Sequence, residues 1–521
     1  MILLEGSYLK IYIKERCIAD IEKLTIQKQD RIGLVGRNGS GKTTLLEVLA
    51  GKRAPDEGSF SHKTQIELLP QLKQTDSHKS GGELTQDYIK ASLARNPEIL
   101  LADEPTTNLD TSHIEWLEKI MNRWQGAFIL VSHDREFLDA LCTKIWEIED
   151  GKLKEYNGNY SDYKAQKEQE LLQQKNAYED YERTKSQLEN ALDMKVRKAE
   201  RATKKPKNLS ASEASITGAK PYFAKKEKKL LKTAKAIETR LEKLDKVEKI
   251  KDLPTIKMDL PNERAFKNRI VLRVTDTPGI IGDRTLWKPA TFHIKGGDKL
   301  AIIGPNGSGK TTLLKKIMNQ TEGFSVSPAM KIGYFSQNID ILNTNETILE
   351  NVKSTSRQDE TFVRTVLARL RFFREDVYKP VDVLSGGERV KVAFAKLFVS
   401  DINTLILDEP TNFLDIEAVE ALEELLNDYE GTILFVSHDR RFIEKIATRL
   451  LLFEHREIKL FNGTYPEYKN YEPETERDAK EDQLLVIETK ITEVLSRLSI
   501  EPSDALEKEF QELLQKKREL I

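Results

Sequence analysis

Cysteine is almost absent from this 521-residue sequence, in which Cys17 and Cys142 are the only two. Neither lies at a spacing typical of metal ligands, and so few cysteines fit a reducing compartment. The chain also lacks a run of about 18 apolar residues, and it does not begin with a basic segment followed by an apolar core. We therefore expect a cytoplasmic protein with no membrane-spanning segment and no signal peptide.

Excess charge of one sign is absent as well. The chain has 83 Lys and Arg against 85 Asp and Glu, for a formal charge of -2. This near balance identifies no partner by itself, because the charge is unevenly distributed along the chain. The length predicts two to four domains, each with its own core.

Two glycine-rich loops, each followed by the same three motifs in the same order, are the most informative feature present. The loops run from Gly36 to Thr43 (GRNGSGKT) and from Gly304 to Thr311 (GPNGSGKT). Each precedes a Ser-Gly-Gly-Glu string, an apolar run ending in Asp-Glu, and a Ser-His-Asp string. These motifs begin at residues 80, 103 and 132 in the first set, and at 385, 408 and 437 in the second. Two ordered sets indicate a tandem duplication.

The pattern within each repeat predicts an α/β fold. Short apolar runs, typical of buried parallel strands, lie at 31–35, 99–101 and 127–131, and again at 299–303, 404–407 and 432–436. A helix is expected directly after each loop, at 43–49 and 311–318. The second repeat has room for a helical subdomain at 347–378, whereas the first repeat is a trimmed copy.

The segment between the repeats has a different composition and predicts a helical hairpin. Residues 160–201 contain no Gly or Pro and predict one long helix, and 224–251 predict a second, with a turn or loop at 204–223. Two more helical stretches, 484–498 and 505–520, are expected in the tail. From Lys195 to Lys232 we count thirteen Lys or Arg and three Glu, a local charge of +10. Such a cluster favours phosphate backbones, and Tyr222 and Phe223 could stack on a base or a ligand. The alternative is a solvated helical face.

The glycine-rich loops predict phosphate binding, because their backbone N–H groups can point at phosphate oxygens ahead of a helix N-terminus. Lys42 and Lys310 would contact the β- and γ-phosphates of a nucleotide, and Thr43 and Thr311 would ligate Mg²⁺. Asp103 and Asp408 end buried strands, where the metal is the expected partner of each carboxylate. The adjacent Glu104 and Glu409 would polarise the attacking water. Taken alone, an Asp-Glu pair would be better explained as a surface pair at the end of a strand.

These motifs together resemble the ATP-binding cassette ATPases. The resemblance implies ATP and Mg²⁺ as cofactors, with two ATP molecules held between head-to-tail units of one monomer. It joins Lys42 with Ser385, Gly386 and Gly387 in one site, and Lys310 with Ser80, Gly81 and Gly82 in the other. The remaining loop residues implied to bind ATP are Gly36, Asn38, Gly39, Ser40, Gly41, Thr44, Gly304, Asn306, Gly307, Ser308, Gly309 and Thr312.

The same resemblance assigns roles outside the loops. Gln71 and Gln337 would sense the metal, Asp110 and Asp415 would cross the interface, and His133 and His438 would contact the γ-phosphate. The chain departs from the family at the residue that stacks on adenine. That residue is usually aromatic, and by alignment the positions here are Ile13 and Ile281, so base selectivity is expected to be loose.

Two cassettes in one chain, with a helical linker between them, resemble the ABC-F class, and the trimmed first cassette and basic hairpin resemble its Vga-type antibiotic-resistance group. The resemblance implies a first cassette at 1–158, a linker at 159–262 with a resistance loop near 205–223, a second cassette at 263–472 and a C-terminal helical extension at 473–521. The fold class is thus α/β, with two tandem P-loop cassettes joined by a helical hairpin. Candidate loop contacts to RNA or the drug site are Lys204, Lys205, Lys207, Ser212, Ser215, Ile216, Thr217, Lys220, Tyr222 and Phe223.

The implied function is ribosome protection. The ATP-closed protein would bind the tRNA exit site, contact large-subunit rRNA and P-site tRNA, and displace lincosamides, streptogramin A compounds or pleuromutilins, with hydrolysis driving release. A housekeeping ABC-F translation factor and the ATPase subunit of a transporter are the alternatives, although a coupling subunit needs no long basic protrusion. The drug spectrum, direct or allosteric displacement, and the relative activity of the two sites stay open.

Overall fold

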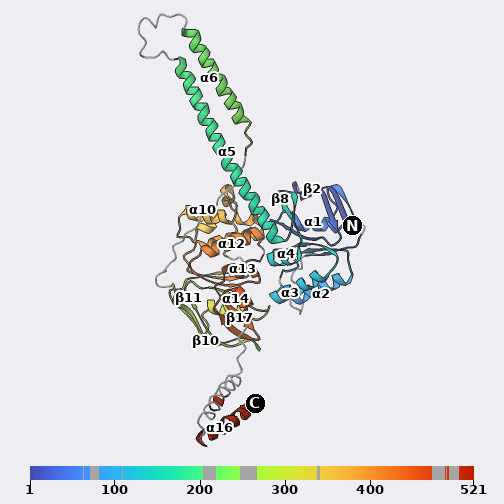
Figure 1. Cartoon of the computed structure of the whole chain (residues 1–521), viewed down its shortest axis with the longest axis vertical. Coiled ribbons are helices and arrows are strands. Elements are labelled where there is room, and N and C mark those ends of the chain that lie inside the picture. The colour runs from blue at the N-terminus through green and yellow to red at the C-terminus, as the bar shows by residue number, and fades with distance from the viewer. Residues whose placement is uncertain are drawn as a thin grey trace.

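The computed structural model describes residues 1–13, 15–62, 64–70, 81–107, 109–203, 219–246, 267–336, 341–412, 414–471, 487, 490–491, 494 and 504–520. Over these residues the chain forms two α/β units side by side, with a long helical hairpin rising from between them and a further helix at the C-terminal end (Figure 1).

The first unit is built on a six-stranded sheet. In spatial order its strands are β5 (Ile66–Leu69), β6 (Ile99–Asp103), β7 (Ala127–Val131), β3 (Arg31–Gly36), β8 (Lys144–Glu149) and β9 (Lys152–Asn157). Neighbouring strands run parallel except β8 and β9. Every residue of β6 and β7 is buried, as expected for strands covered on both faces. The three strands predicted here are confirmed.

Two layers of different structure cover this sheet. On one face, α1 (Lys42–Leu49) packs between the sheet and a three-stranded antiparallel sheet of β1 (Ile2–Ile13), β2 (Arg16–Gln27) and β4 (Glu57–His62), and all share one apolar core. A second core on the opposite face joins α2 (Gly81–Ala94), α3 (Thr111–Arg123) and α4 (Arg135–Leu141). The antiparallel sheet was not predicted from the sequence.

The second unit repeats this plan. Its six-stranded sheet has the order β14 (Ile332–Phe335), β15 (Thr404–Asp408), β16 (Thr432–Val436), β12 (Lys299–Ile303), β17 (Arg449–Glu454) and β18 (Glu457–Phe461). The antiparallel sheet comprises β10 (Ile270–Ile281), β11 (Arg284–Lys295) and β13 (Phe324–Val326). The covering helices are α8 (Lys310–Met318), α11 (Gly386–Phe398), α12 (Ile416–Asp428) and α13 (Arg440–Ile446).

The helical subdomain predicted in the second unit is confirmed, in several short pieces. These are α9 (Ile348–Lys353), α10 (Glu360–Arg369), and the 3-10 turns η2 (Arg374–Tyr378) and η3 (Val381–Val383). They pack with α11 on the largest apolar core of the described residues. The corresponding interval of the first unit, 71–80, lies outside the described residues.

The linker forms a helical hairpin, with two corrections to its predicted bounds. The first helix, α5 (Tyr160–Thr203), is confirmed. The second, α6 (Ala219–Glu242), begins within the segment predicted as a loop and ends before the predicted residue 251. Pro221 does not prevent the early start, because the first turn of a helix needs no internal N–H donor. Residues 204–218 lie outside the described part of the chain.

The second unit ends with α14 (Tyr465–Lys469), whose Tyr465 belongs to its apolar core, and the C-terminal helix is α16 (Asp504–Leu520). Residues 505–520 are therefore helical as predicted, whereas most of 484–498 lies outside the described residues. A search of the described residues for a helix long and apolar enough to cross a bilayer finds none.

The hairpin depends on small side chains where its two helices meet. Ala199 of α5 and Ala234 of α6 are buried, although most of the residues around them are exposed. Replacing Ala199 by Asp places a carboxylate without a partner between the helices, which disfavours their pairing. We expect faster amide hydrogen exchange in α5 and α6, with unchanged ATPase activity in the units.

Ala177→Asp provides the matched control, because Ala177 lies on the same helix but is exposed. Equal exchange rates in the two variants would contradict the assignment of Ala199 to the contact between the helices.

Candidate nucleotide sites

Each glycine-rich loop joins a central strand to the helix behind it: β3 to α1 in the first unit and β12 to α8 in the second. Gly41 and Gly309 end the loops with φ angles of 97° and 104°, in the left-handed region that favours glycine. A Cβ on Gly309 would lie 2.7 Å from the Trp287 ring. The loops can therefore turn tightly against the antiparallel sheets and present their N–H groups.

The two loop lysines are buried and face inward. Lys42 Nζ donates to the carbonyl oxygens of Gly36 and Arg37 at 2.6 and 3.0 Å, and Lys310 makes the equivalent bonds in the second unit at 2.8 and 3.0 Å. Burial lowers the pKa of both lysines, while nearby carboxylates, first Glu104 and Glu409 respectively, oppose the shift. Each ammonium group is thus held by two carbonyl oxygens of its own loop.

Within each unit, the threonine and the aspartate predicted to bind the metal lie next to each other. Thr311 Oγ1 donates to Asp408 Oδ1 at 3.2 Å, and Thr43 donates in the same way to Asp103. Burial raises the pKa of both aspartates, and the threonine hydrogen bonds oppose this. A hydroxyl and a carboxylate oxygen are the donors that Mg²⁺ prefers.

The following glutamates occupy a strained backbone position. Glu104 and Glu409 have φ angles of 51° and 50°, in a region that few residues other than Gly adopt. Their N–H groups donate to the carbonyls of Val131 and Val436 at 2.8 and 3.0 Å, which fixes each turn to the neighbouring strand. Burial raises the pKa of Glu104 to about 8 and that of Glu409 to about 7. These values suit a group that accepts a proton near neutral pH.

The two histidines lie beside these glutamates. His133 Nε2 is 3.3 Å from Glu104 Oε1, and His438 Nε2 is 3.4 Å from Glu409 Oε1. His438 Nε2 also hydrogen-bonds Asn306 Oδ1 of the glycine-rich loop at 3.0 Å. Burial lowers the pKa of His133 to about 4 and of His438 to about 3, so both rings are neutral at pH 7.

The aspartates predicted to cross between units do so. Asp110 Oδ2 accepts from the Asn306 amide at 3.2 Å, and Asp415 Oδ2 accepts from the Asn38 amide at 3.0 Å. The other oxygen of each carboxylate caps its own helix, α3 or α12. Burial favours a raised pKa for Asp110, but hydrogen bonds from Ser112, His113 and Asn306 outweigh it and hold the pKa well below its usual range.

A cavity of about 710 Å³ in the second unit brings the predicted residues together. Glu409, His438 and Ile281 all line it. Arg284 also lines this cavity, and the assignment of Ile281 to the base position stays a prediction. The other predicted residues on its wall are Asn306, Gly307, Gly309, Lys310, Thr311, Thr312 and Asp408.

The loops fit a phosphate group on one further observation. The hydroxyls of Ser40 and Ser308 are buried and have no hydrogen-bond partner among the described residues. No cluster of three or more His, Cys, Asp or Glu that could hold a metal occurs in that part of the chain. A metal at either site would therefore be held by the Thr and Asp oxygens, with phosphate and water completing the shell.

The remaining predicted residues lie at helix starts, in or next to the loops, at a strand end, or outside the described part of the chain. Gln71, Ser80 and Gln337 lie outside the described residues. Gly81 and Gly82 begin α2, and Ser385 caps α11 with Gly386 and Gly387 in its first turn. Gly36, Gly39, Thr44 and Gly304 lie in or next to the loops as predicted, whereas Ile13 is an exposed strand end. The pairing of each loop with the opposite Ser-Gly-Gly segment stays a prediction.

The sequence interpretation missed charged residues at the interface. Arg37 Nε lies 3.1 Å from Glu417 Oε2, and Arg440 Nη2 lies 2.5 Å from Glu118 Oε1. Arg135 pairs with Glu423. Comparing the repeats could have revealed the last two pairs, because each arginine directly follows Ser-His-Asp and each glutamate lies eight residues after Asp110 or Asp415.

Two such units facing head to tail in one chain define a tandem ATP-binding cassette protein. A family model described as ABC transporter matches residues 20–79 and 287–412, and an extension model with the same description matches 146–258. The ribosome protection protein VmlR of Bacillus subtilis is 34% identical over 98% of this chain and 96% of its own length. The erythromycin resistance ATP-binding protein MsrA of Staphylococcus epidermidis is 34% identical over 82% and 93%.

A solved structure has the same fold. The archaeal ribosome recycling factor aABCE1, in complex with the ribosomal stalk protein aP1, matches with a TM-score of 0.58 and 19% identity, over 89% of this chain and 91% of its own. With relatives at 34% identity over nearly their full length, the chain belongs to the ABC-F class of ATP-binding cassette proteins. Its cassettes are ATP-hydrolysing domains.

Substitutions at Asp110 separate its two contacts. Ala removes both the helix cap and the bond to the Asn306 amide, whereas Ser keeps a capping oxygen but is too short to reach across the interface. We expect Asp110→Ala to lower the free energy of unfolding by about 1 kcal/mol and Asp110→Ser to change it little. Both should lower the ATPase rate about tenfold or more, since each loses the bond between the cassettes. Urea unfolding and steady-state turnover measure the two effects.

An ATPase rate near that of the unmodified protein for Asp110→Ser, with only Ala impaired, would show that the cap alone matters.

Proposed function

We propose that the protein is a ribosome-protecting ATPase whose closed, ATP-bound cassettes hold the basic hairpin against RNA. It would act in the cytoplasm as a monomer on the ribosome. The hairpin would enter the tRNA exit site, near large-subunit rRNA and P-site tRNA, and dislodge a drug from the peptidyl-transferase centre. Lincosamides, streptogramin A compounds and pleuromutilins are the proposed drugs. The names of VmlR and MsrA support this, because both relatives are described as protection or resistance proteins.

The observation that carries the proposal is the position of the hairpin root between the cassettes. Lys164 of α5 donates to Glu420 of α12 in the second cassette at 2.6 Å. Ser161 at the start of α5 donates to Asp139 of α4 and accepts from Arg441 of α13 at 2.9 Å. Residues of both cassettes thus hold the first turns of α5, and the direction of the hairpin depends on how the cassettes meet.

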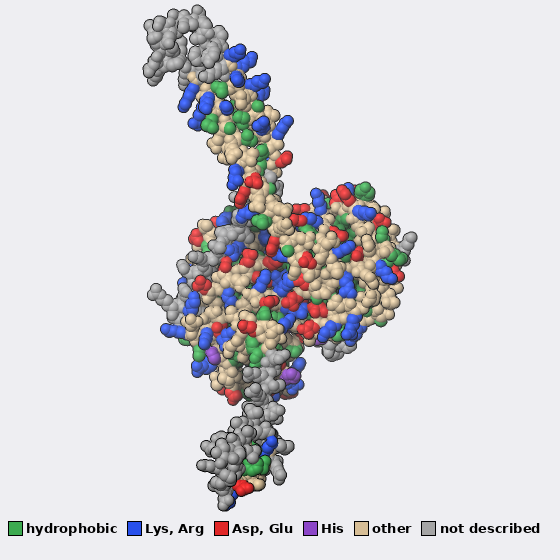
Figure 2. Space-filling model, viewed as in Figure 1, with side chains coloured by type: hydrophobic (Ala, Val, Ile, Leu, Met, Phe, Trp, Pro, Cys, Tyr) green, Lys and Arg blue, Asp and Glu red, His purple; other side chains and the backbone are tan. Residues whose placement is uncertain are grey.

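The distal part of the hairpin is basic on the described residues. Lys225, Lys228, Lys229 and Lys232 of α6 are exposed, and Figure 2 shows Lys and Arg side chains gathered over this end of the protrusion. The rest of the visible surface mixes both signs. Such a concentration of positive charge far from the cassettes suits contact with RNA phosphates.

The proposed chemistry follows from the site. Bound Mg-ATP supplies the phosphoanhydride that is cleaved. Glu104 and Glu409 would orient the attacking water and accept its proton, while His133 and His438 would contact the γ-phosphate. Thr43 with Asp103, and Thr311 with Asp408, would hold the metal, assisted by Gln71 and Gln337. Domain limits of 1–158, 159–262, 263–472 and 473–521 are proposed with this function.

Blocking hydrolysis tests the proposal. Glu104→Gln combined with Glu409→Gln removes both proton acceptors while leaving the phosphate loops intact, so we expect the closed state to persist with ATP. The variant should cosediment with ribosomes in ATP and not in ADP. Adding Lys42→Ala and Lys310→Ala, which removes the loop cations, should abolish cosedimentation and is the control. If the Glu variant binds ATP yet stays in the supernatant, the proposed function is wrong.

The hairpin charge gives a second test, which also separates resistance from a housekeeping role. Replacing Lys225, Lys228, Lys229 and Lys232 by Gln should leave ATPase turnover intact. It should weaken ribosome binding and flatten its salt dependence, because fewer counterions are released. In cells, the unmodified gene should raise the inhibitory drug concentration, and the variant should not.

The control replaces four exposed lysines of the first cassette, Lys23, Lys28, Lys52 and Lys152, by Gln. Unchanged drug susceptibility with and without the unmodified gene would favour a housekeeping translation factor instead.

A further inference from the structure

Two arginines at the interface have no assigned part in nucleotide binding. Arg135 begins α4 and Arg440 begins α13, and each lies two residues after a histidine of the nucleotide sites. Their side chains are 2% and 5% exposed. Burying a guanidinium group is costly unless carboxylates surround it, so each position should have a specific partner.

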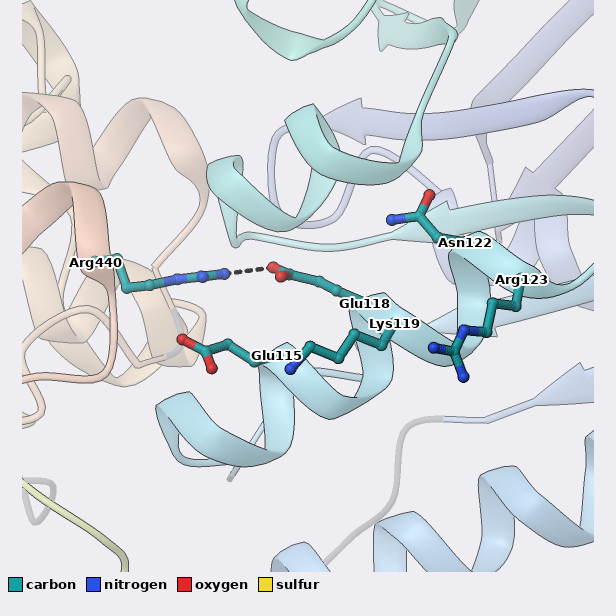
Figure 3. A pocket seen from close by; sticks show the side chains of 6 residues that line it. All are labelled: Glu115, Glu118, Lys119, Asn122, Arg123 and Arg440. Carbon is teal, nitrogen blue, oxygen red and sulfur yellow. Dashed lines mark hydrogen bonds and ion pairs between the residues drawn. The ribbon is translucent and has the colours of Figure 1, made fainter. Parts of the chain in front are cut away.

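Both arginines pair with a helix of the opposite cassette. Arg440 Nη2 lies 2.5 Å from Glu118 Oε1 of α3, and Figure 3 shows this pair spanning the gap between the two cassettes. Arg135 binds both carboxylate oxygens of Glu423 of α12, with Nη1 at 3.2 Å from Oε2. The contacts are thus pseudo-symmetric.

The same two helices already contact the opposite nucleotide site at their N-termini. Asp110, which caps α3, accepts from the Asn306 amide, and Glu118 two turns later binds Arg440. In the same way, α12 contacts Asn38 through Asp415 and Arg135 through Glu423. Each helix therefore contacts both the glycine-rich loop of one site and the turn that carries the histidine of the same site (the histidine loop).

These histidine loops are where the reaction geometry is completed. His438 contacts both Glu409 and Asn306, and Asp439 caps α13 by accepting from the Phe442 amide at 2.9 Å. Arg440 is the next residue, so the position of its side chain constrains the turn that carries His438. A helix is rigid over two turns, which means that α3 fixes the distance between the loop and the histidine turn.

We propose that Arg135 and Arg440 are positioning residues for hydrolysis. Each holds the histidine turn of its own cassette on helix α3 or α12 of the other, so the histidine takes its reactive position only when the cassettes are closed. Nucleotide binding by the phosphate loop does not need this contact, whereas turnover does. The inference concerns the ATPase reaction itself and does not depend on ribosome binding.

The surrounding charges explain why both arginines stay ionised. Arg135 also lies 3.5 Å from Asp439, and Lys445 Nζ donates to Glu423 at 2.7 Å. Arg440 Nε lies 2.8 Å from Glu136. Burial lowers the pKa of each guanidinium, but the carboxylates outweigh it and raise the pKa above its usual value. Both guanidinium groups therefore carry a positive charge at neutral pH.

The test uses the full chain and four variants of one pair: Glu118→Gln, Arg440→Gln, both together, and the exchange Glu118→Arg with Arg440→Glu. We expect each single change to lower kcat about 10- to 100-fold, with KM for ATP changed less than about threefold. The double Gln variant should be no worse than either single, because both remove the same contact. The exchanged pair should recover at least about tenfold of the loss.

Lys164→Ala is the control, because its ion pair joins the linker to Glu420 of α12 in the second cassette and involves neither Arg135 nor Arg440. It should keep kcat within about twofold. Melting temperatures are measured for all variants. Three outcomes would overturn the proposal. The losses in kcat could multiply in the double variant, they could follow the melting temperatures, or the Lys164 variant could reproduce them. A rise in KM that accounts for the whole effect would overturn it as well.

Discussion

The structure depends on two carboxylates, Asp110 and Asp415, each shared between its own helix and the opposite phosphate loop. One oxygen of each satisfies an N–H group at the start of a helix, and the other satisfies a backbone amide 3.0 to 3.2 Å away in the other cassette. Such a group needs both partners, because a buried charge with half its hydrogen bonds is costly. The cassette interface therefore forms part of each site.

The two sides of the pseudo-symmetric interface differ in their contacts with the linker. Glu420 of α12 receives Lys164 from the linker, whereas the equivalent Glu115 of α3 lines an open cavity of about 470 Å³ beside Arg440 (Figure 3). The linker thus rests on the second cassette at the place where the first leaves space. The ion pairs on the two sides differ in burial as well: Glu423 is 2% exposed and Glu118 is 17% exposed. Equivalent chemistry in the two sites is therefore compatible with unequal mechanical roles.

The sequence predicted those features of the fold that depend on local patterns of residues. The buried strands, the loops and α5 follow from apolar runs, glycine spacing and the absence of helix breakers. It missed the antiparallel sheets, whose strands are stabilised by pairing, and the pairs of Arg135 and Arg440, whose partners lie hundreds of residues away. The sequence prediction also extended α6 too far. An apolar stripe in α6 cannot show that the N-terminal part of α5 packs on the first cassette and not on α6. There Lys154 of the first cassette binds Glu170 and Tyr163 binds Glu147.

The length of α5 turns small changes at the interface into large ones at its far end. A helix of 44 residues spans ~66 Å, so a rotation of ~5° at its root moves the far end by ~6 Å. Tyr160 at that root lies under the Arg441 guanidinium at 5.6 Å, and Tyr163 is buried against the first cassette. Because both cassettes contact this one turn, their relative position sets the direction of the helix. The rigidity that places the histidines for hydrolysis is therefore the same property that would aim the hairpin.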